Sequence, residues 1–171
     1  MNGLLQISDP HFGTEQAGAV QALVRLVAQR RPAAVLLSGD ITQRATAAQF
    51  AAARAFVQQL ASVPVLAIPG NHDIPLFALF TRLLRPYARF EAALGPVQDL
   101  RFGNGDWFVL GLNTTRAWRH KNGEVSARQV EQTAALLRDA PPAAVKVVMT
   151  HQPVAVTQAS DIPNLLRGRE A

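Results

Sequence analysis

The 171-residue sequence contains no cysteine, which excludes both a disulfide framework and a thiolate metal site. Any metal bound by this chain must therefore be held by His, Asp, Glu or Asn side chains. Lysine is scarce as well: Lys121 and Lys146 are the two lysines, so arginine carries most of the formal net charge of +5. The arginines are scattered, and no basic run interleaved with aromatics marks a nucleic-acid track. We expect no specific nucleic-acid partner, whereas a small anionic substrate such as a phosphate compound suits the positive charge.

Long apolar segments are missing too. No uninterrupted apolar stretch approaches the roughly 20 residues of a membrane span, and the N-terminus lacks the basic start and apolar stretch of a signal peptide. We therefore expect a cytoplasmic protein without a membrane partner. A hydrophobic content of 49% is ample for one core in a chain of this length, so a single domain over residues 1–171 is expected.

Apolar runs of strand length alternate with helical patterns in the first part of the chain. We expect strands at 3–8, 33–38 and 63–68, with helices at 15–31 and 46–61 between them. Repeated β-α-β order of this kind predicts a parallel sheet. Thr46 and Gln49 have the spacing of a capping box, which supports the second helix.

The pattern is less regular after residue 75. We expect two helical pieces within 75–95, separated at Pro86, and then an antiparallel hairpin formed by 98–102 and 107–113. A helix at 131–139 and a last strand at 143–149 follow. Ser126 and Gln129 repeat the capping-box spacing before the last of these helices. The tail from residue 157 has no clear pattern. The whole order favours an α/β fold.

Polar side chains follow four of the expected strands. They are Asp9 and His11 after the first strand, Asp40 after the second, Asn71, His72 and Asp73 after the third, and His151 after the last. Ligands of open α/β sheets bind beyond the carboxyl ends of the strands. We therefore expect these side chains to converge at one end of the sheet.

This set of side chains suits a pair of metal ions. Asp9 and His11 are two residues apart in a segment expected to be extended, so both can point the same way and hold one ion. Asp40 follows Gly39, which leaves room for close approach, and its two oxygens can bridge two cations. Oxygen and imidazole ligands favour Mn, Fe, Zn or Co, and two ions about 3.5 to 4 Å apart clamp a phosphate and activate water. Phosphoester hydrolysis is the function that this chemistry favours.

Each piece taken alone also has a plainer interpretation. Asp9 suits a cap of the following helix, Gly39 and Asp40 suit an ordinary turn, and His151 suits a hydrogen-bonded buried histidine. Phe12, next to the first pair of ligands, suits either stacking on a base or packing in the core. The loop at 114–124 gathers arginine, histidine and lysine, which suits either an anion-binding lip or a solvated loop.

The ordered set D-P-H, G-D, G-N-H-D and a late T-H resembles the calcineurin-like metallophosphoesterase family, especially its bacterial cyclic-nucleotide phosphodiesterase-like branch. The resemblance extends from Leu4 to about His151. It implies a four-layer α/β/β/α sandwich and a dinuclear metal-dependent hydrolase. The implied substrate is a small phosphoester, cyclic nucleotides or similar phosphodiesters being the narrower expectation. The oligomeric state stays open, with a homodimer as one option.

The resemblance also assigns roles by position. Two residues would hold the first ion, one would bridge both ions and two would hold the second: Asp9 and His11, then Asp40, then Asn71 and His151. His72 would face the phosphate, where it would stabilise the transition state or protonate the leaving oxygen. Asp73 would orient His72 from behind.

The sequence departs from the family pattern at one point. The family closes with G-H-x-H, and no histidine follows His151 here. The resemblance then implies three protein ligands for each ion instead of four, and a chain that corresponds to the N-terminal two-thirds of the family domain. A second hypothesis follows from this departure: a chain that keeps the fold and binds metal or nucleotide with impaired or no catalysis.

Overall fold

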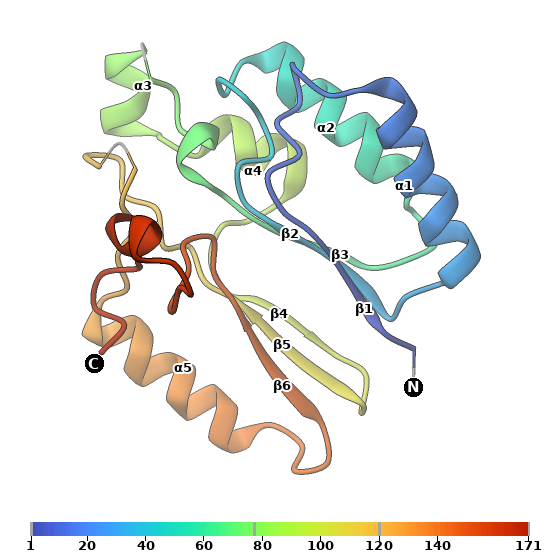
Figure 1. Cartoon of the computed structure of the whole chain (residues 1–171), viewed down its shortest axis with the longest axis vertical. Helices are drawn as coiled ribbons and strands as arrows, with labels where there is room; N and C mark the ends of the chain where they lie inside the picture. Colours follow the sequence, from blue (N-terminus) through green and yellow to red (C-terminus); the bar gives the residue numbers. More distant parts are fainter. Residues whose placement is uncertain (1, 77, 120, 171) are drawn as a thin grey trace.

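The structure, a computed structural model, describes residues 2–76, 78–119 and 121–170. Its first half is a parallel three-stranded sheet with β2 in the centre. The elements of this half are β1 (Leu4–Ile7), α1 (Ala17–Arg30), β2 (Ala34–Ser38), α2 (Ala47–Gln59) and β3 (Val65–Ile68). Both helices cover the same outer face of the sheet (Figure 1). The predicted β-α-β order and parallel pairing are therefore confirmed.

The second half forms another three-stranded sheet. Its elements are β4 (Leu100–Gly103), β5 (Trp107–Gly111), α5 (Ala127–Asp139) and β6 (Val145–Met149). β4 and β5 form the predicted antiparallel hairpin, and β6 pairs with β5 in parallel. The helix α5 crosses from β5 to β6 on the side of this sheet that faces away from the first sheet (Figure 1).

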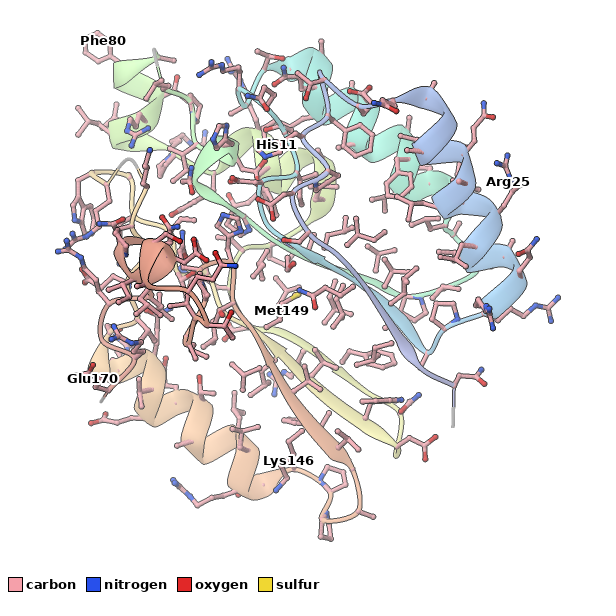
Figure 2. All side chains as sticks on the ribbon, in the orientation of Figure 1. His11, Arg25, Phe80, Lys146, Met149 and Glu170 are labelled. Carbon is pink, nitrogen blue, oxygen red and sulfur yellow. The ribbon has the colours of Figure 1, made fainter. Side chains whose placement is uncertain are left out.

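Two layers of apolar side chains hold the sheets and helices together. Between the sheets, Ile68, Val109 and Met149 are buried in one cluster, and Figure 2 places Met149 between the two sheets. Under α1 and α2, a larger cluster includes Leu37 and Phe56. Every residue of β2 is buried because this strand has side chains covered on both faces. The α/β/β/α arrangement expected of the fold class is thus confirmed.

Two short helices connect the sheets, α3 (Leu79–Leu84) and α4 (Ala88–Leu94), with the predicted break at Pro86 between them. α4 buries Phe90, whose ring contacts the ring of Phe50 on α2 edge to face. α3 is largely exposed, and Phe80 points away from the body of the protein (Figure 2). None of the described helices is both long and apolar enough to cross a bilayer.

Local sequence signals set the helix ends. The hydroxyls of Thr46 and Ser126 accept hydrogen bonds from the backbone N–H groups of Gln49 and Gln129, which completes both predicted capping boxes. The tail predicted without a pattern contains a short 3-10 helix, η2 (Ala159–Asn164). The tail is held against the loop before α5, because the N–H of Val125 donates to the carbonyl of Arg167.

The burial of Leu37 makes the core directly testable. Leu37 is 0% exposed in the central strand, whereas Leu84 on α3 is 78% exposed. We expect Leu37→Ala to lower the free energy of unfolding by about 2 to 5 kcal/mol, because it removes apolar burial and leaves a cavity. Leu84→Ala deletes the same atoms at the surface and should change it by about 0.5 kcal/mol or less. Urea unfolding followed by circular dichroism measures both, and equal losses would contradict the core assignment.

Candidate metal centre

The candidate residues lie at one end of the two sheets because the strands before them end there. Asp9 follows β1, Asp40 follows β2, and the segment Asn71–Asp73 forms a short 3-10 helix, η1, directly after β3. His151 follows β6 in the second sheet. The loops after β1 and β2 run side by side: the N–H of Asp9 donates to the carbonyl of Gly39 at 3.1 Å. The predicted convergence at the carboxyl ends of the strands is therefore seen for these loops.

Three of the side chains form a compact cluster. One ligand atom from each of Asp9, His11 and Asp40 lies within 4.8 Å of the other two. His11 Nε2 is 3.9 Å from Asp9 Oδ1 and 4.0 Å from Asp40 Oδ2. The carboxylates of Asp9 and Asp40 repel each other when their oxygens lie within 4.8 Å, and a cation between them removes that repulsion.

The backbone that produces this cluster differs from the expected one. β1 already ends at Ile7, and Asp9 and His11 have positive φ angles of 53° and 46°. The expectation that an extended segment points both side chains the same way is therefore wrong. Left-handed turns at each residue bring them together instead, which is costly for residues other than glycine and typical of functional sites.

Two of the plainer interpretations can also be decided. Asp9 does not cap the following helix, because its carboxylate accepts a hydrogen bond from Ser8 Oγ and the N-cap of α1 is Gln16. Phe12 is 3% exposed, and its ring lies 5.5 Å from that of Phe56. Phe12 is thus a core residue and is not placed to stack on a substrate.

Asp40 lies at the centre of the site, and its two oxygens face different partners. Oδ1 accepts the backbone N–H of His72 at 2.8 Å and lies 3.3 Å from His151 Nε2. Oδ2 lies 4.0 Å from both His11 Nε2 and His72 Nε2. The residue itself is 6% exposed. A single buried carboxylate thus lies between three imidazoles.

Two glycines allow this close packing. A Cβ atom on Gly39 would lie 2.4 Å from His151 Nδ1, and Gly39 has a φ angle of +98° that favours glycine. A Cβ atom on Gly70 would lie 2.1 Å from the backbone nitrogen and Oδ1 of Asp40. The glycines of the G-D and G-N-H-D motifs therefore leave the space that His151 and Asp40 occupy.

Backbone carbonyls orient the two histidines next to Asp40. His72 Nδ1 lies 2.9 Å from the carbonyl oxygen of Gln43, and His151 Nδ1 lies 2.9 Å from that of Ser38. A carbonyl only accepts, so each Nδ1 carries the proton and each Nε2 faces Asp40. No sequence signal marks Gln43 or Ser38 for this purpose, because the contact uses the main chain.

The charges of the site reinforce one another. Burial raises the pKa of Asp40, but hydrogen bonds and charges from His151 and His72 outweigh it and bring the pKa below its ordinary value. Burial lowers the pKa of His151, but its hydrogen bond to Asp40 and the charge of that carboxylate outweigh it and raise the pKa. Asp40 is therefore ionised, as a metal ligand must be.

Asp73 has a different position from the one predicted. Its carboxylate is 1% exposed and accepts hydrogen bonds from four donors: the N–H groups of Gly70, Ile41 and Thr42 and the hydroxyl of Thr42. The prediction that Asp73 orients the ring of His72 is wrong, because the ring is held by the carbonyl of Gln43. Asp73 instead ties the loop after β3 to the loop after β2. Burial raises its pKa, and the four hydrogen bonds oppose this effect.

Asn71 begins η1 and is half-buried, next to the residue whose N–H binds Asp40. Its role as a ligand stays a prediction. In the loop at 114–124, Arg119 forms an ion pair with Glu124 at 2.7 Å, and Arg116 lies 4.0 Å from the same carboxylate. His120, which was part of the predicted anion-binding lip, lies outside the described residues.

Gln152, the residue after His151, has a structural role that no sequence motif indicates. Gln152 is 5% exposed, accepts a hydrogen bond from Thr114 Oγ1 at 2.5 Å and donates to the carbonyl of Lys121 at 3.4 Å. It fastens the segment that carries His151 to the loop after β5. In the sequence, Gln152 could be noticed only as a polar residue that follows the end of a strand. Many surface residues have the same position, so it does not distinguish a buried structural residue.

The residues present fit a divalent cation. The donors are carboxylate oxygens from Asp9 and Asp40 and imidazole Nε2 atoms from His11 and His151, which suit Mn, Fe, Zn or Co. The Nε2 atoms of His11 and His151 both face the shared carboxylate of Asp40. A cation held by such a set would stabilise negative charge on a substrate and activate water. The set therefore supports hydrolysis of an anionic substrate.

Comparison with known proteins agrees with this chemistry. The family model described as calcineurin-like phosphoesterase matches residues 4–169, which include every candidate site residue. No curated protein matches the chain.

The role found for Asp73 leads to a test of the loop architecture. Asp73→Asn keeps the size of the side chain but places an amide NH₂ group against backbone donors, so buried N–H groups lose their acceptor. We expect the free energy of unfolding to fall by about 1 to 3 kcal/mol. Asp106→Asn, at an exposed position, is the matched control and should change it by about 0.5 kcal/mol or less. Urea unfolding distinguishes the two, and similar values for both variants would remove the structural role of Asp73.

Proposed function

Because the chain belongs to the calcineurin-like phosphoesterase family, we propose that it is a dinuclear phosphodiesterase whose metal centre is built around Asp40. Membership of the family implies divalent metal ions and hydrolysis of a phosphoester. The observation that supports a two-metal centre is the division of partners at Asp40, whose Oδ2 faces His11 and whose Oδ1 faces His151. A carboxylate with partners on both oxygens is suited to bridging two ions.

The proposed ligand sets share this carboxylate. Asp9, His11 and Asp40 would hold the first ion, and Asp40, Asn71 and His151 would hold the second. Divalent ions at these positions would supply neutralisation of the phosphate charge and activation of water. The protein contributes the fixed positions: His151 is held by the carbonyl of Ser38 and by the space that Gly39 leaves open.

His72 is the proposed catalytic group that is not a ligand. Its side chain is 34% exposed, while that of Asp40 is 8% exposed, so the imidazole is reachable by a substrate lying over the cluster. The carbonyl of Gln43 holds Nδ1, which leaves Nε2 directed to the cluster. A proton on Nε2 can stabilise charge that develops on the phosphate or be given to the leaving oxygen.

The substrate class is the finer part of the proposal. A net charge of +5 favours anionic substrates, of which a small phosphodiester is one. Cyclic nucleotides are the proposed example because the order of motifs resembles the cyclic-nucleotide phosphodiesterase-like branch.

A second candidate function is binding without efficient hydrolysis. The ligand sets proposed above supply three side chains to each ion. Water can complete the coordination, but it lacks the advantage of a ligand that the fold already holds in place. In this alternative the chain keeps the fold and binds metal or nucleotide with little turnover.

Chelation separates the two candidates. The chain treated with EDTA should not hydrolyse bis(4-nitrophenyl) phosphate, and added Mn²⁺ should restore hydrolysis, since the ions position and activate the reactants. Colour release measures turnover, and elemental analysis of the dialysed protein measures bound metal per chain. Bound metal without any turnover would support the second candidate, and hydrolysis that is indifferent to EDTA would contradict both.

The roles of two histidines can be distinguished by the same substitution. His72→Asn should reduce turnover by about 100-fold or more and leave bound metal per chain unchanged, because it removes a proton donor. His151→Asn should lower the bound metal per chain, because it removes a ligand. If His72→Asn loses metal, His72 is itself a ligand. A loss of turnover below about tenfold would remove its catalytic role.

A further inference from the structure

A large groove lies outside the proposed metal centre. It has a volume of about 1200 Å³ and is lined by residues of α3, α5, the β4–β5 hairpin and the loops between them. None of its lining residues is a proposed ligand or catalytic residue. Pockets for small molecules commonly measure about 300 to 1000 Å³, so this groove is large enough for an organic ligand.

Much of the lining is apolar. Leu100 and Leu110 come from the hairpin, and Leu136 comes from α5. Leu83 on α3 and Trp118 line the groove while being 79% and 76% exposed. Large apolar side chains that are exposed beside a hollow are typical of surfaces that contact a ligand or partner. An aliphatic or aromatic body would find contacts on both walls.

Positive charge is in excess along the groove. One carboxylate lines the groove, that of Asp99. Four arginines also line it: Arg82, Arg101, Arg116 and Arg128. Within the described residues, the arginines that form ion pairs are Arg116, Arg119 and Arg169. Arg101 and Arg128 are exposed, and neither forms an ion pair with a carboxylate in the part of the chain that the structure describes. Arg82 is anchored by hydrogen bonds to the carbonyls of Pro75 and Arg119.

We propose that this groove binds a small amphipathic anion: a molecule with a phosphate, sulfate or carboxylate head and a hydrocarbon or aromatic body. The apolar walls account for the body, and the unpaired guanidinium groups account for the head, since arginine binds such oxyanions with two parallel hydrogen bonds. Inorganic phosphate lacks the body, and a neutral amphiphile lacks the head. Both should bind more weakly than a ligand that has the two parts.

The tryptophans of the chain give a direct readout. The sequence has two, Trp107 and Trp118, so Trp107→Phe leaves Trp118 in the groove as the sole tryptophan reporter. Decyl phosphate below its micellar concentration is the probe, with decanol and inorganic phosphate as comparisons. The titration is run without added metal, so its outcome does not depend on hydrolysis. Calorimetric titration of the unsubstituted chain repeats the measurement in case the Trp107 variant fails to fold.

We expect decyl phosphate to shift the emission of Trp118 and to bind at least about tenfold more tightly than either comparison compound. Arg101→Gln and Arg128→Gln should each weaken binding by about fivefold, and higher salt should weaken it further. Arg138→Gln is the matched control: it lies on α5 with Arg128 but does not line the groove, and it should leave binding unchanged.

Thr133 faces the groove from α5, so Thr133→Phe fills part of the space and should weaken binding by about tenfold. Circular dichroism confirms that each variant is folded. Decanol or inorganic phosphate binding as tightly as decyl phosphate would overturn the proposal. So would equal affinities for the Arg128 and Arg138 variants, because the charge would then act without regard to the groove.

Discussion

The buried carboxylate of Asp73 is the constraint on which the rest of the site depends. It accepts hydrogen bonds from Gly70 on its own loop and from Ile41 and Thr42 on the loop after β2. Asp40 directly precedes Ile41, and His72 directly precedes Asp73. The hydrogen bonds of Asp73 therefore fix the main chain on which Asp40 and His72 are placed, and the N–H of His72 in turn binds Asp40 at 2.8 Å.

This arrangement concentrates negative charge where the strands end. Asp9 and Asp40 contribute carboxylates to one cluster, and the imidazoles of His11, His72 and His151 surround Asp40. Main-chain acceptors, left-handed turns and glycines without a Cβ atom hold the groups at short range. Burying these charged groups together costs free energy, and bound cations would offset that cost. The geometry and the family membership therefore support the same metal-dependent function.

Much of this could be predicted from the sequence. Alternating apolar runs and capping boxes such as Thr46 with Gln49 determine the order of the elements, and the rule that ligands gather beyond strand ends placed Asp40 and His151 near each other. The left-handed φ angles of Asp9 and the partners of Asp73 could not be predicted, because they follow from contacts between loops that are distant in sequence. The groove could not be predicted either, since its lining comes from segments between residues 82 and 136 that share no sequence pattern.

We propose that the carboxylate of Asp40 bridges two metal ions. Anomalous diffraction from crystals grown with Mn²⁺ can test this, because the scattering shows the number and the positions of the ions. We expect two peaks about 3.5 to 4 Å apart, one on each side of the carboxylate of Asp40. A single peak at this site, or two peaks that do not share Asp40, would contradict it.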